Sequence, residues 1–360
     1  METAAAVGRL DPENIAKKAK SRLPEQSDPA FVTVQGRKLE VRRIAGANRD
    51  APVLVFLHEG LGSVSMWRDF PEKVAHATGC SALVYSRYGY GESDVLGEPR
   101  GVDYMHVEAL EALPALLEEL SIRDPVLVGH SDGGSIALIY AGARGRAKGL
   151  VVLAPHVFVE DISVKSIAEA KTAFETTDLP QKLGRYHADA AKTFWGWNHI
   201  WLHPDFRGWN IEEFLPRVHC PVHAGIQGFL GSTLLFEPLD ESRHRFEHHA
   251  GLVAVRRVPA IGEAQQLDRA AGLPRDRVQL RHGPVFVVEA LDREHGAIHA
   301  RQDFDDEYGT MAQLEAIARQ TGGPIELLRL TDCRHSPHRD QPGAVIEAMS
   351  RFIERLEEQD

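Results

Sequence analysis

The sequence predicts an α/β fold with a mostly parallel sheet, helices on both faces of that sheet and a helical cap over one end. Two observations predict this class. Strand-like apolar segments alternate with helix-like segments, as in chains whose parallel strands are joined by right-handed helical crossovers. Several segments, such as PVLVFL at residues 52–57, are continuously apolar, which is typical of strands buried on both faces.

The expected elements begin after an N-terminal extension over residues 1–29. Residues 31–34 and 39–44 flank Gln35-Gly36, which indicates a hairpin-linked pair of strands at an antiparallel edge. In the helix expected at 103–120, Asp103 suits the N-cap and Pro114 predicts a kink. Further strands are expected at 52–57, 81–85, 125–128, 150–154, 221–227 and 325–330, and helices at 65–78, 103–120, 131–143 and 342–356.

Residues 157–216 interrupt this alternation and are helical in character, so we expect them to form the cap. Four of the five tryptophans lie in this segment. Two interpretations of the rings stay open: they attach the cap to the core, or they line a pocket for an apolar substrate. On the second interpretation the pocket residues are Glu59, His156, Trp195, Trp197 and Trp201.

Residues 229–303 fit the pattern poorly and divide the core domain, which is expected over 30–156, 217–228 and 304–360. They are rich in Arg and His and weakly periodic, so we predict an insertion: a small excursion, a long surface loop or partial disorder. PVFVVEA at 284–290 is a candidate strand within it. Two histidine pairs at i, i+4 spacing, 244/248 and 295/299, lack an H-E-x-x-H pattern and predict a solvated surface, not a metal site.

The composition bounds the partners. A formal net charge of −11 argues against nucleic acid, because phosphate binding needs a basic face. Three cysteines make no disulfide framework, and reduced thiols fit the cytoplasm. No apolar run is long enough to span a membrane, and the N-terminus has no secretory h-region. We expect a cytoplasmic monomer or homodimer that acts on a small molecule without cofactor or metal.

The strongest motif is Gly129-His130-Ser131-Asp132-Gly133, which follows a predicted buried strand and opens a predicted helix. This is the context of a nucleophile elbow, in which the serine occupies a strained turn and the glycines permit close approach. The new helix aims backbone N–H groups at developing negative charge. The motif predicts Ser131 as a nucleophile, and the alternative is a glycine-rich turn without catalysis.

On these residues the chain resembles the α/β-hydrolase superfamily over about residues 30–228 and 304–357. Besides the elbow, the resemblance rests on FLHEGLGS at 56–63, YGYGES at 88–93 and CRHSP at 333–337. It implies an oxyanion hole formed by the backbone N–H of Gly60, or alternatively Glu59, together with that of Asp132. The family usually has glycine where Glu59 stands, so we expect this carboxylate to point away from the hole.

The resemblance also implies His335 as the general base, with His338 as its competitor and Arg334 facing solvent. In the family the acid follows the penultimate strand in a G-x-x-D arrangement. Removing 229–303 would join Gly228 to Phe304-Asp305-Asp306-Glu307, which makes Asp306 the expected acid. Three alternatives stay open: Asp305, Asp161, and Asp292 if PVFVVEA at 284–290 replaces the strand at 221–227 in the sheet.

The implied function is a serine hydrolase that cleaves a carboxylic ester-like bond of a small, apolar substrate through an acyl-enzyme. Hydrolysis of a thioester, a lactone or a carbon–carbon bond would use the same triad. A non-catalytic ligand-binding protein with the same pocket is the alternative from a different class. A third possibility is that the insertion displaces Asp306 and impairs the enzyme.

Overall fold

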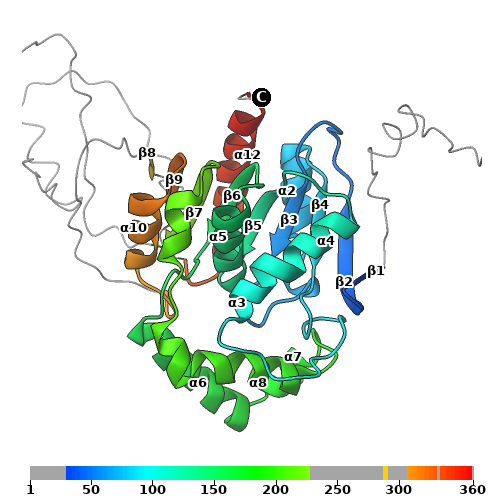
Figure 1. Cartoon of the computed structure of the whole chain (residues 1–360), viewed down its shortest axis with the longest axis vertical. Helices are drawn as coiled ribbons and strands as arrows, with labels where there is room; N and C mark the ends of the chain where they lie inside the picture. Colours follow the sequence, from blue (N-terminus) through cyan, green and yellow to red (C-terminus); the bar gives the residue numbers. More distant parts are fainter. Residues whose placement is uncertain (1–29, 228–286, 291–305, 331–332, 359–360) are drawn as a thin grey trace, which may run out of the picture. The chain divides into compact units, whose positions relative to one another are not determined.

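The computed structural model describes residues 30–227, 287–290, 306–330 and 333–358. Within these residues nine strands form one sheet in the order β1-β2-β4-β3-β5-β6-β7-β9-β8 (Figure 1). The strands are β1 (Ala30–Val34), β2 (Arg37–Ile44), β3 (Leu54–Leu57), β4 (Ala82–Tyr85), β5 (Val126–His130), β6 (Gly149–Leu153), β7 (Val222–Gln227), β8 (Val287–Ala290) and β9 (Ile325–Leu330).

The sheet is mostly parallel, as the sequence predicts. Six neighbouring strands, from β4 through β3, β5, β6 and β7 to β9, run parallel. The β1–β2 hairpin lies antiparallel at one edge and β8 lies antiparallel at the other. Strands β3 to β6 are buried along their whole length, which explains their continuously apolar sequences.

Helices cover both faces of the sheet. One face carries α3 (Tyr104–Val107), α4 (Leu113–Glu119), α5 (Asp132–Arg144) and α10 (Met311–Gln320), whose apolar side chains form one core cluster with the sheet. The other face carries α2 (Phe70–Thr78) and α12 (Pro342–Glu358), which form the second core cluster. A short helix, α11 (Pro337–Asp340), precedes α12. The α/β class with helices on both faces is therefore confirmed.

Two predicted helices are interrupted. The helix expected at 65–78 is split into a 3-10 turn (Ser65–Trp67) and α2, because Arg68 adopts a φ of 55° that ends the first turn. The helix expected at 103–120 contains a π-turn (Glu108–Ala112) just ahead of Pro114. Since proline has no N–H to donate, the Leu110 carbonyl receives a hydrogen bond from Arg144 instead (2.6 Å). Asp103 occupies the N-cap position but makes no side-chain cap bond.

The segment expected to form the cap leaves the sheet after β6 and returns at β7. It contains α6 (Asp161–Thr176), α7 (Leu179–Leu183), α8 (Ala190–Trp201) and two 3-10 helices (Pro204–Gly208 and Glu212–Arg217). In Figure 1 α6, α7 and α8 lie below the sheet, next to the ends from which β5 and β6 lead into the following segments. Loops that follow the strands at this end therefore face the helical segment.

Most of the predicted insertion, 229–303, lies outside the described residues. Its exception is β8, which covers the last four residues of the candidate strand at 284–290 and pairs with β9. Strand β7 keeps its place between β6 and β9. The alternative in which residues 284–290 replace β7 in the sheet is therefore wrong.

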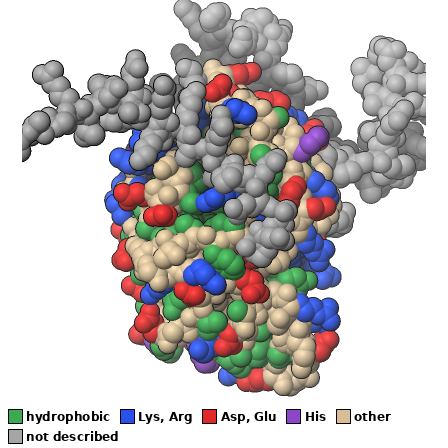
Figure 2. Space-filling view, turned by 90° about the vertical axis from the view of Figure 1, so that its right-hand side faces the viewer, with side chains coloured by type: hydrophobic (Ala, Val, Ile, Leu, Met, Phe, Trp, Pro, Cys, Tyr) green, Lys and Arg blue, Asp and Glu red, His purple; other side chains and the backbone are tan. Residues whose placement is uncertain are grey.

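The face shown in Figure 2 carries charged side chains of both signs, and the cysteines do not form disulfides. Acidic and basic side chains are interspersed over the face shown in Figure 2. Cys80, Cys220 and Cys333 are free thiols. Among the helices of the described residues, none has both the length and the apolar character needed to cross a bilayer.

Candidate active site

Ser131 lies in a strained turn between β5 and α5. Its φ of 52° and ψ of −119° are unusual for a residue with a side chain. A Cβ on Gly133 would overlap the Leu57 carbonyl, and one on Gly129 would overlap the Gly133 backbone. The two glycines of the motif are therefore required because the backbone passes so close to its neighbours at this point.

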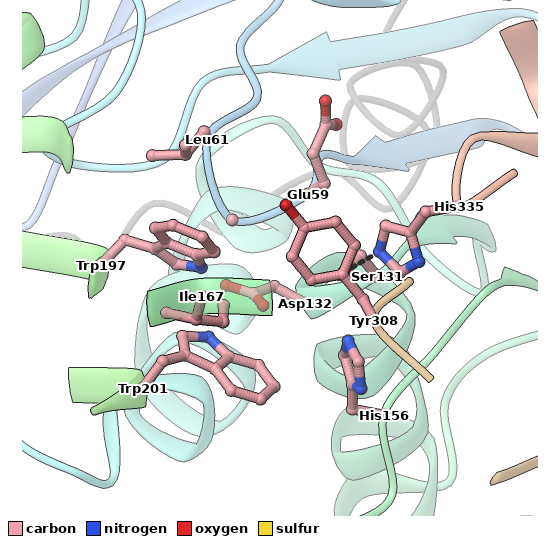
Figure 3. Close-up of a pocket in the computed structure, with 11 residues that line it drawn as sticks. Glu59, Leu61, Ser131, Asp132, His156, Ile167, Trp197, Trp201, Tyr308 and His335 are labelled. Carbon is pink, nitrogen blue, oxygen red and sulfur yellow. Dashed lines mark hydrogen bonds between the residues drawn. The ribbon is translucent and has the colours of Figure 1, made fainter. Parts of the chain in front are cut away.

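Three predicted side chains meet in a line of hydrogen bonds. Ser131 Oγ lies 2.9 Å from His335 Nε2 (Figure 3), and His335 Nδ1 lies 3.0 Å from Asp306 Oδ1. Asp306 also accepts the Tyr308 backbone N–H at 2.9 Å. With Nδ1–H donating to the carboxylate, Nε2 is free to accept from the serine hydroxyl.

The competing histidine does not face Ser131. The His338 ring is buried against Trp67 and Phe70, with ring centroids 4.7 and 5.5 Å apart. Arg334, next to His335, is exposed as expected.

The competing acids are placed elsewhere or fall outside the described residues. Asp161 is exposed at the start of α6 and pairs with Arg207. Asp305 and Asp292 belong to segments that are not described. Of the candidates that can be compared, Asp306 alone contacts His335.

The contact between His335 and Asp306 shifts the pKa of each group in a direction opposite to that caused by burial. Burial by itself would lower the pKa of His335, but the charge of Asp306 and its hydrogen bond raise it above the usual value. Burial would likewise raise the pKa of Asp306, and the charge and hydrogen bond of His335 lower it instead. The geometry therefore favours an ionised Asp306 beside an imidazole that readily takes up a proton.

Two backbone segments approach Ser131 where the oxyanion hole is expected. Asp132 is the first residue of α5, where backbone N–H groups have no partner within the helix. Gly60 belongs to the loop after β3 and lies under the indole of Trp197. A Cβ at residue 60 would overlap the indole nitrogen, so glycine lets the helical segment lie directly on this loop.

The Glu59 carboxylate points away from Ser131, as expected (Figure 3). It lies 3.0 Å from Arg339 Nη2 and 3.3 Å from His130 Nδ1. The other ring nitrogen of His130 donates to the His335 carbonyl at 2.6 Å. Burial would raise the pKa of Glu59, but the hydrogen bond and charge of His130 and the charge of Arg339 hold it well below its usual value.

A cavity of about 120 Å³ opens beside Ser131 (Figure 3). It has largely apolar walls from the helical segment and the loop after β3, and a polar side that carries Ser131. The residues that line it are Glu59, Gly60, Leu61, Ser131, Asp132, His156, Ile167, Trp197, Trp201, Tyr308 and His335.

Comparison with known families settles the relationship. The sequence pattern of the "Alpha/beta hydrolase family" matches residues 54–348. The chain belongs to this family. Within it, a proline iminopeptidase of Lactobacillus helveticus is 34% identical over 98 residues, which are 27% of this chain and 33% of the relative. An sn-1-specific diacylglycerol lipase of Mus musculus is 27% identical over 141 residues, 39% of this chain and 44% of the relative.

These alignments span less than half the length of the curated relatives. Solved structures match over much more of the chain. The proline iminopeptidase of Mycobacterium smegmatis has a TM-score of 0.57 at 12% identity, covering 91% of this chain and 98% of that one. An esterase of Thermogutta terrifontis has a TM-score of 0.54 at 15% identity, covering 92% and 99%. At such identities the likeness shows the fold alone.

Of the tryptophans predicted to line the pocket of this α/β-hydrolase, Trp195 does not. Trp197 and Trp201 are four residues apart on α8 and share its inner face. Trp195 lies two residues from Trp197, on a different side of the helix, and its ring contacts Phe174 and His199. The sequence predicted that this helix carries aromatic pocket residues, but the spacing of residues around the helix turns Trp195 away from the cavity.

Three residues that line the cavity were not predicted from the sequence: Leu61, Ile167 and Tyr308. Leu61 and Tyr308 each lie within two residues of a predicted site residue, Gly60 and Asp306, which was an available signal. Ile167 comes from α6, and no sequence pattern marks it. Within the described part of the chain, no group of three or more His, Cys, Asp or Glu side chains is arranged to hold a metal ion; both histidine pairs of the insertion lie outside it.

Proposed function

We propose that this α/β-hydrolase cleaves carboxylic esters of a small substrate through an acyl-enzyme on Ser131. The observation that carries the proposal is the line of hydrogen bonds from Ser131 through His335 to Asp306. A serine hydroxyl is a weak nucleophile until a neighbouring base removes its proton. Here a base lies at hydrogen-bonding distance, with a buried carboxylate behind it.

In this proposal His335 takes the proton of Ser131 as the oxygen attacks the carbonyl carbon, and returns it to the departing alcohol. Water then attacks the acyl-enzyme with His335 again as base, which releases the acid and restores the serine. Asp306 holds His335 in the tautomer that accepts at Nε2 and stabilises the imidazolium. Asp306 occupies this position although a long insertion separates it from β7.

In this proposal the backbone N–H groups of Gly60 and Asp132 stabilise the negative charge that develops on the carbonyl oxygen. Removal of one such donor from an oxyanion hole costs about 3–4 kcal/mol of transition-state stabilisation. The side chain of Glu59 does not oppose this, because Arg339 and His130 hold it on the far side of the loop.

The cavity supports a small substrate group. Its volume of about 120 Å³ is below the roughly 150 Å³ of a cavity known to accept benzene. Ile167, Trp197 and Trp201 give it apolar walls. The cavity therefore suits a short acyl chain.

The first experiment compares wild-type protein with Ser131→Ala on p-nitrophenyl acetate and butyrate. Turnover in the variant should fall to background, and a fluorophosphonate probe should label only the wild type. Ser65→Ala, an exposed serine outside the site, is the matched control and should keep both signals. Unchanged turnover in Ser131→Ala would overturn the proposal, and wild-type protein that neither reacts nor labels would favour the ligand-binding alternative.

A panel of substrates tests whether the enzyme prefers a bond other than a carboxylic ester. Thioesters, lactones and β-diketones can use the same three residues, and the matched relatives include proline iminopeptidases. The panel therefore adds one member of each class and an L-prolyl arylamide. The proposal expects the highest kcat/KM on short esters, and a clear preference for another class would replace esters as the substrate.

A further inference from the structure

Two buried polar side chains line the cavity and have hydrogen-bonding capacity that the described residues leave unused. They are Asp132 and His156, which are 1% and 2% exposed. Trp201 links the two: its ring packs against His156 with centroids 4.8 Å apart, and its indole N–H donates to Tyr104, which contacts Asp132. We call Asp132 and His156 the polar pair.

His156 is held in place by its backbone, while its ring remains without a full set of partners. Ser135 Oγ donates to its carbonyl at 2.6 Å and accepts from its N–H at 3.1 Å. Its ring Nδ1 is buried with no hydrogen-bond partner among the described residues. Buried polar atoms of this kind are rare in native proteins and need an explanation, such as a bound group that completes them.

His156 is also neutral. Burial and the nearby His335, whose ring centroid is 5.8 Å away, lower the pKa of His156 to about 3. A neutral imidazole offers one donor and one acceptor nitrogen. It can therefore both donate a hydrogen bond to an uncharged polar group and accept one from it.

The Asp132 carboxylate is partly satisfied. The Tyr104 hydroxyl donates to it at 2.6 Å, and Arg87 lies 3.8 Å away as a buried counter-ion. Burial raises the pKa of this carboxyl group, while the charge of Arg87 and the hydrogen bond from Tyr104 oppose that rise. In its ionised form the group only accepts hydrogen bonds and has room for about four. Among the described side chains, Tyr104 is the one that lies within hydrogen-bonding distance, so capacity for a further donor remains.

These charges select among possible substrate groups. A substrate carboxylate would be repelled by Asp132. An ammonium would meet the guanidinium of Arg87 close behind the Asp132 carboxylate, which opposes its binding. A hydroxyl can donate to Asp132 or exchange a hydrogen bond with His156, and it carries no charge into a cavity with apolar walls.

We infer that the polar pair makes the cavity selective for a short acyl group that bears a hydroxyl. This inference rests on the proposed function, because it assumes that the acyl group of an ester enters the cavity beside Ser131. It identifies the substrate class as small hydroxyacyl esters and makes His156 a specificity-determining residue.

The test uses matched p-nitrophenyl esters in which a hydroxyl replaces a methyl group. The pairs are lactate with isobutyrate and 3-hydroxybutyrate with isovalerate, and 3-aminobutyrate supplies an ammonium of similar size. At least one hydroxyl ester should exceed its methyl partner in kcat/KM by about tenfold or more, since sites built around a polar group reject analogues that lack it.

The variant His156→Phe keeps a ring in the same space but removes its nitrogens, and it should reduce that ratio toward one. His199→Phe makes the same substitution at an exposed histidine that does not line the cavity, and it should keep the ratio. A merely structural His156 would alter activity on both members of a pair alike.

The outcomes separate the two proposals. Equal rates within both pairs, a preference for the methyl esters or for the ammonium ester, or a ratio unchanged in His156→Phe would overturn the hydroxyacyl inference. If those reactions still require Ser131, the proposed serine hydrolase stands. Absence of hydrolysis on every ester, with no fluorophosphonate labelling of Ser131, overturns both.

Discussion

At the residue scale, the reactive character of the site depends on which side chains are buried together. His335 would be a weak base if burial acted alone, and contact with Asp306 reverses that effect. His156 has no such partner, so the same burial leaves it neutral. Two histidines whose ring centroids are 5.8 Å apart thus acquire opposite properties from their neighbours.

Asp306→Asn should therefore change the pH profile as well as the rate. His335 must be neutral to act as base, so wild-type kcat/KM should rise with pH through its raised pKa, above the ordinary 6.5. Without the Asp306 carboxylate, burial lowers that pKa and the rise should move to lower pH. The plateau should fall by roughly 10⁴-fold, as in the serine-protease triad.

The matched control is Asp161→Asn, at the exposed acid that was an alternative in the sequence. Its pH profile and rate, measured on the same p-nitrophenyl ester from pH 5 to 9, should match wild type. A profile in Asp306→Asn that keeps the wild-type midpoint would contradict the assignment of Asp306.

At the element scale, the loop after β3, the end of β5 and the segment that carries His335 and α11 are connected behind Ser131. Glu59 in the loop after β3 pairs with Arg339 on α11. His130 at the end of β5 joins Glu59 to the His335 carbonyl. Glu59, which departs from the family pattern, therefore connects the loop after β3 to the loop that carries His335.

Glu59→Gln should destabilise the protein in a pH-dependent way. At pH 7 the loss of this largely buried anion, whose side chain is 15% exposed, should cost about 2 kcal/mol of the free energy of unfolding. The folded-state pKa of Glu59 is lowered, so its contribution is present above the unfolded value, about 4.3, and disappears as pH falls through the folded value. The difference between variant and wild type should therefore shrink below about pH 4.

Urea unfolding at a series of pH values measures this difference. Glu98→Gln is the matched control, because Glu98 pairs with Arg37 at the surface with its side chain 70% exposed. That control should change the free energy of unfolding by less than about 0.5 kcal/mol. A difference for Glu59→Gln that stays constant down to acid pH would refute the role of its charge.

At the scale of the whole molecule, the parallel sheet brings distant residues together. Ser131 follows β5 and His335 follows β9, and Asp306 lies between β7 and β9 in the chain. Strands β7 and β9 pair directly over six positions. This pairing holds the two segments in place whatever the length of the chain that connects them, since lengthening a loop adds little closure entropy.

Excision of residues 229–303 should therefore leave a folded, active hydrolase. The deletion removes the short edge strand β8 and joins Gly228 to Phe304, which restores the G-x-x-D spacing before Asp306. Fluorophosphonate labelling of Ser131 and thermal unfolding followed by circular dichroism check this. A deletion variant that unfolds cooperatively but no longer labels would show that the insertion takes part in the site.

The sequence alone determined the fold class, the order of the central strands along the chain and the elbow at Ser131. These features depend on local periodicity, glycine placement and short motifs, which act within a few residues. Only the tertiary structure decided that Asp306 reaches His335, that Trp197 faces the cavity while Trp195 does not, and that Glu59 turns toward Arg339. Such facts depend on packing between segments far apart in the chain, because charge state and side-chain direction are set by three-dimensional neighbours.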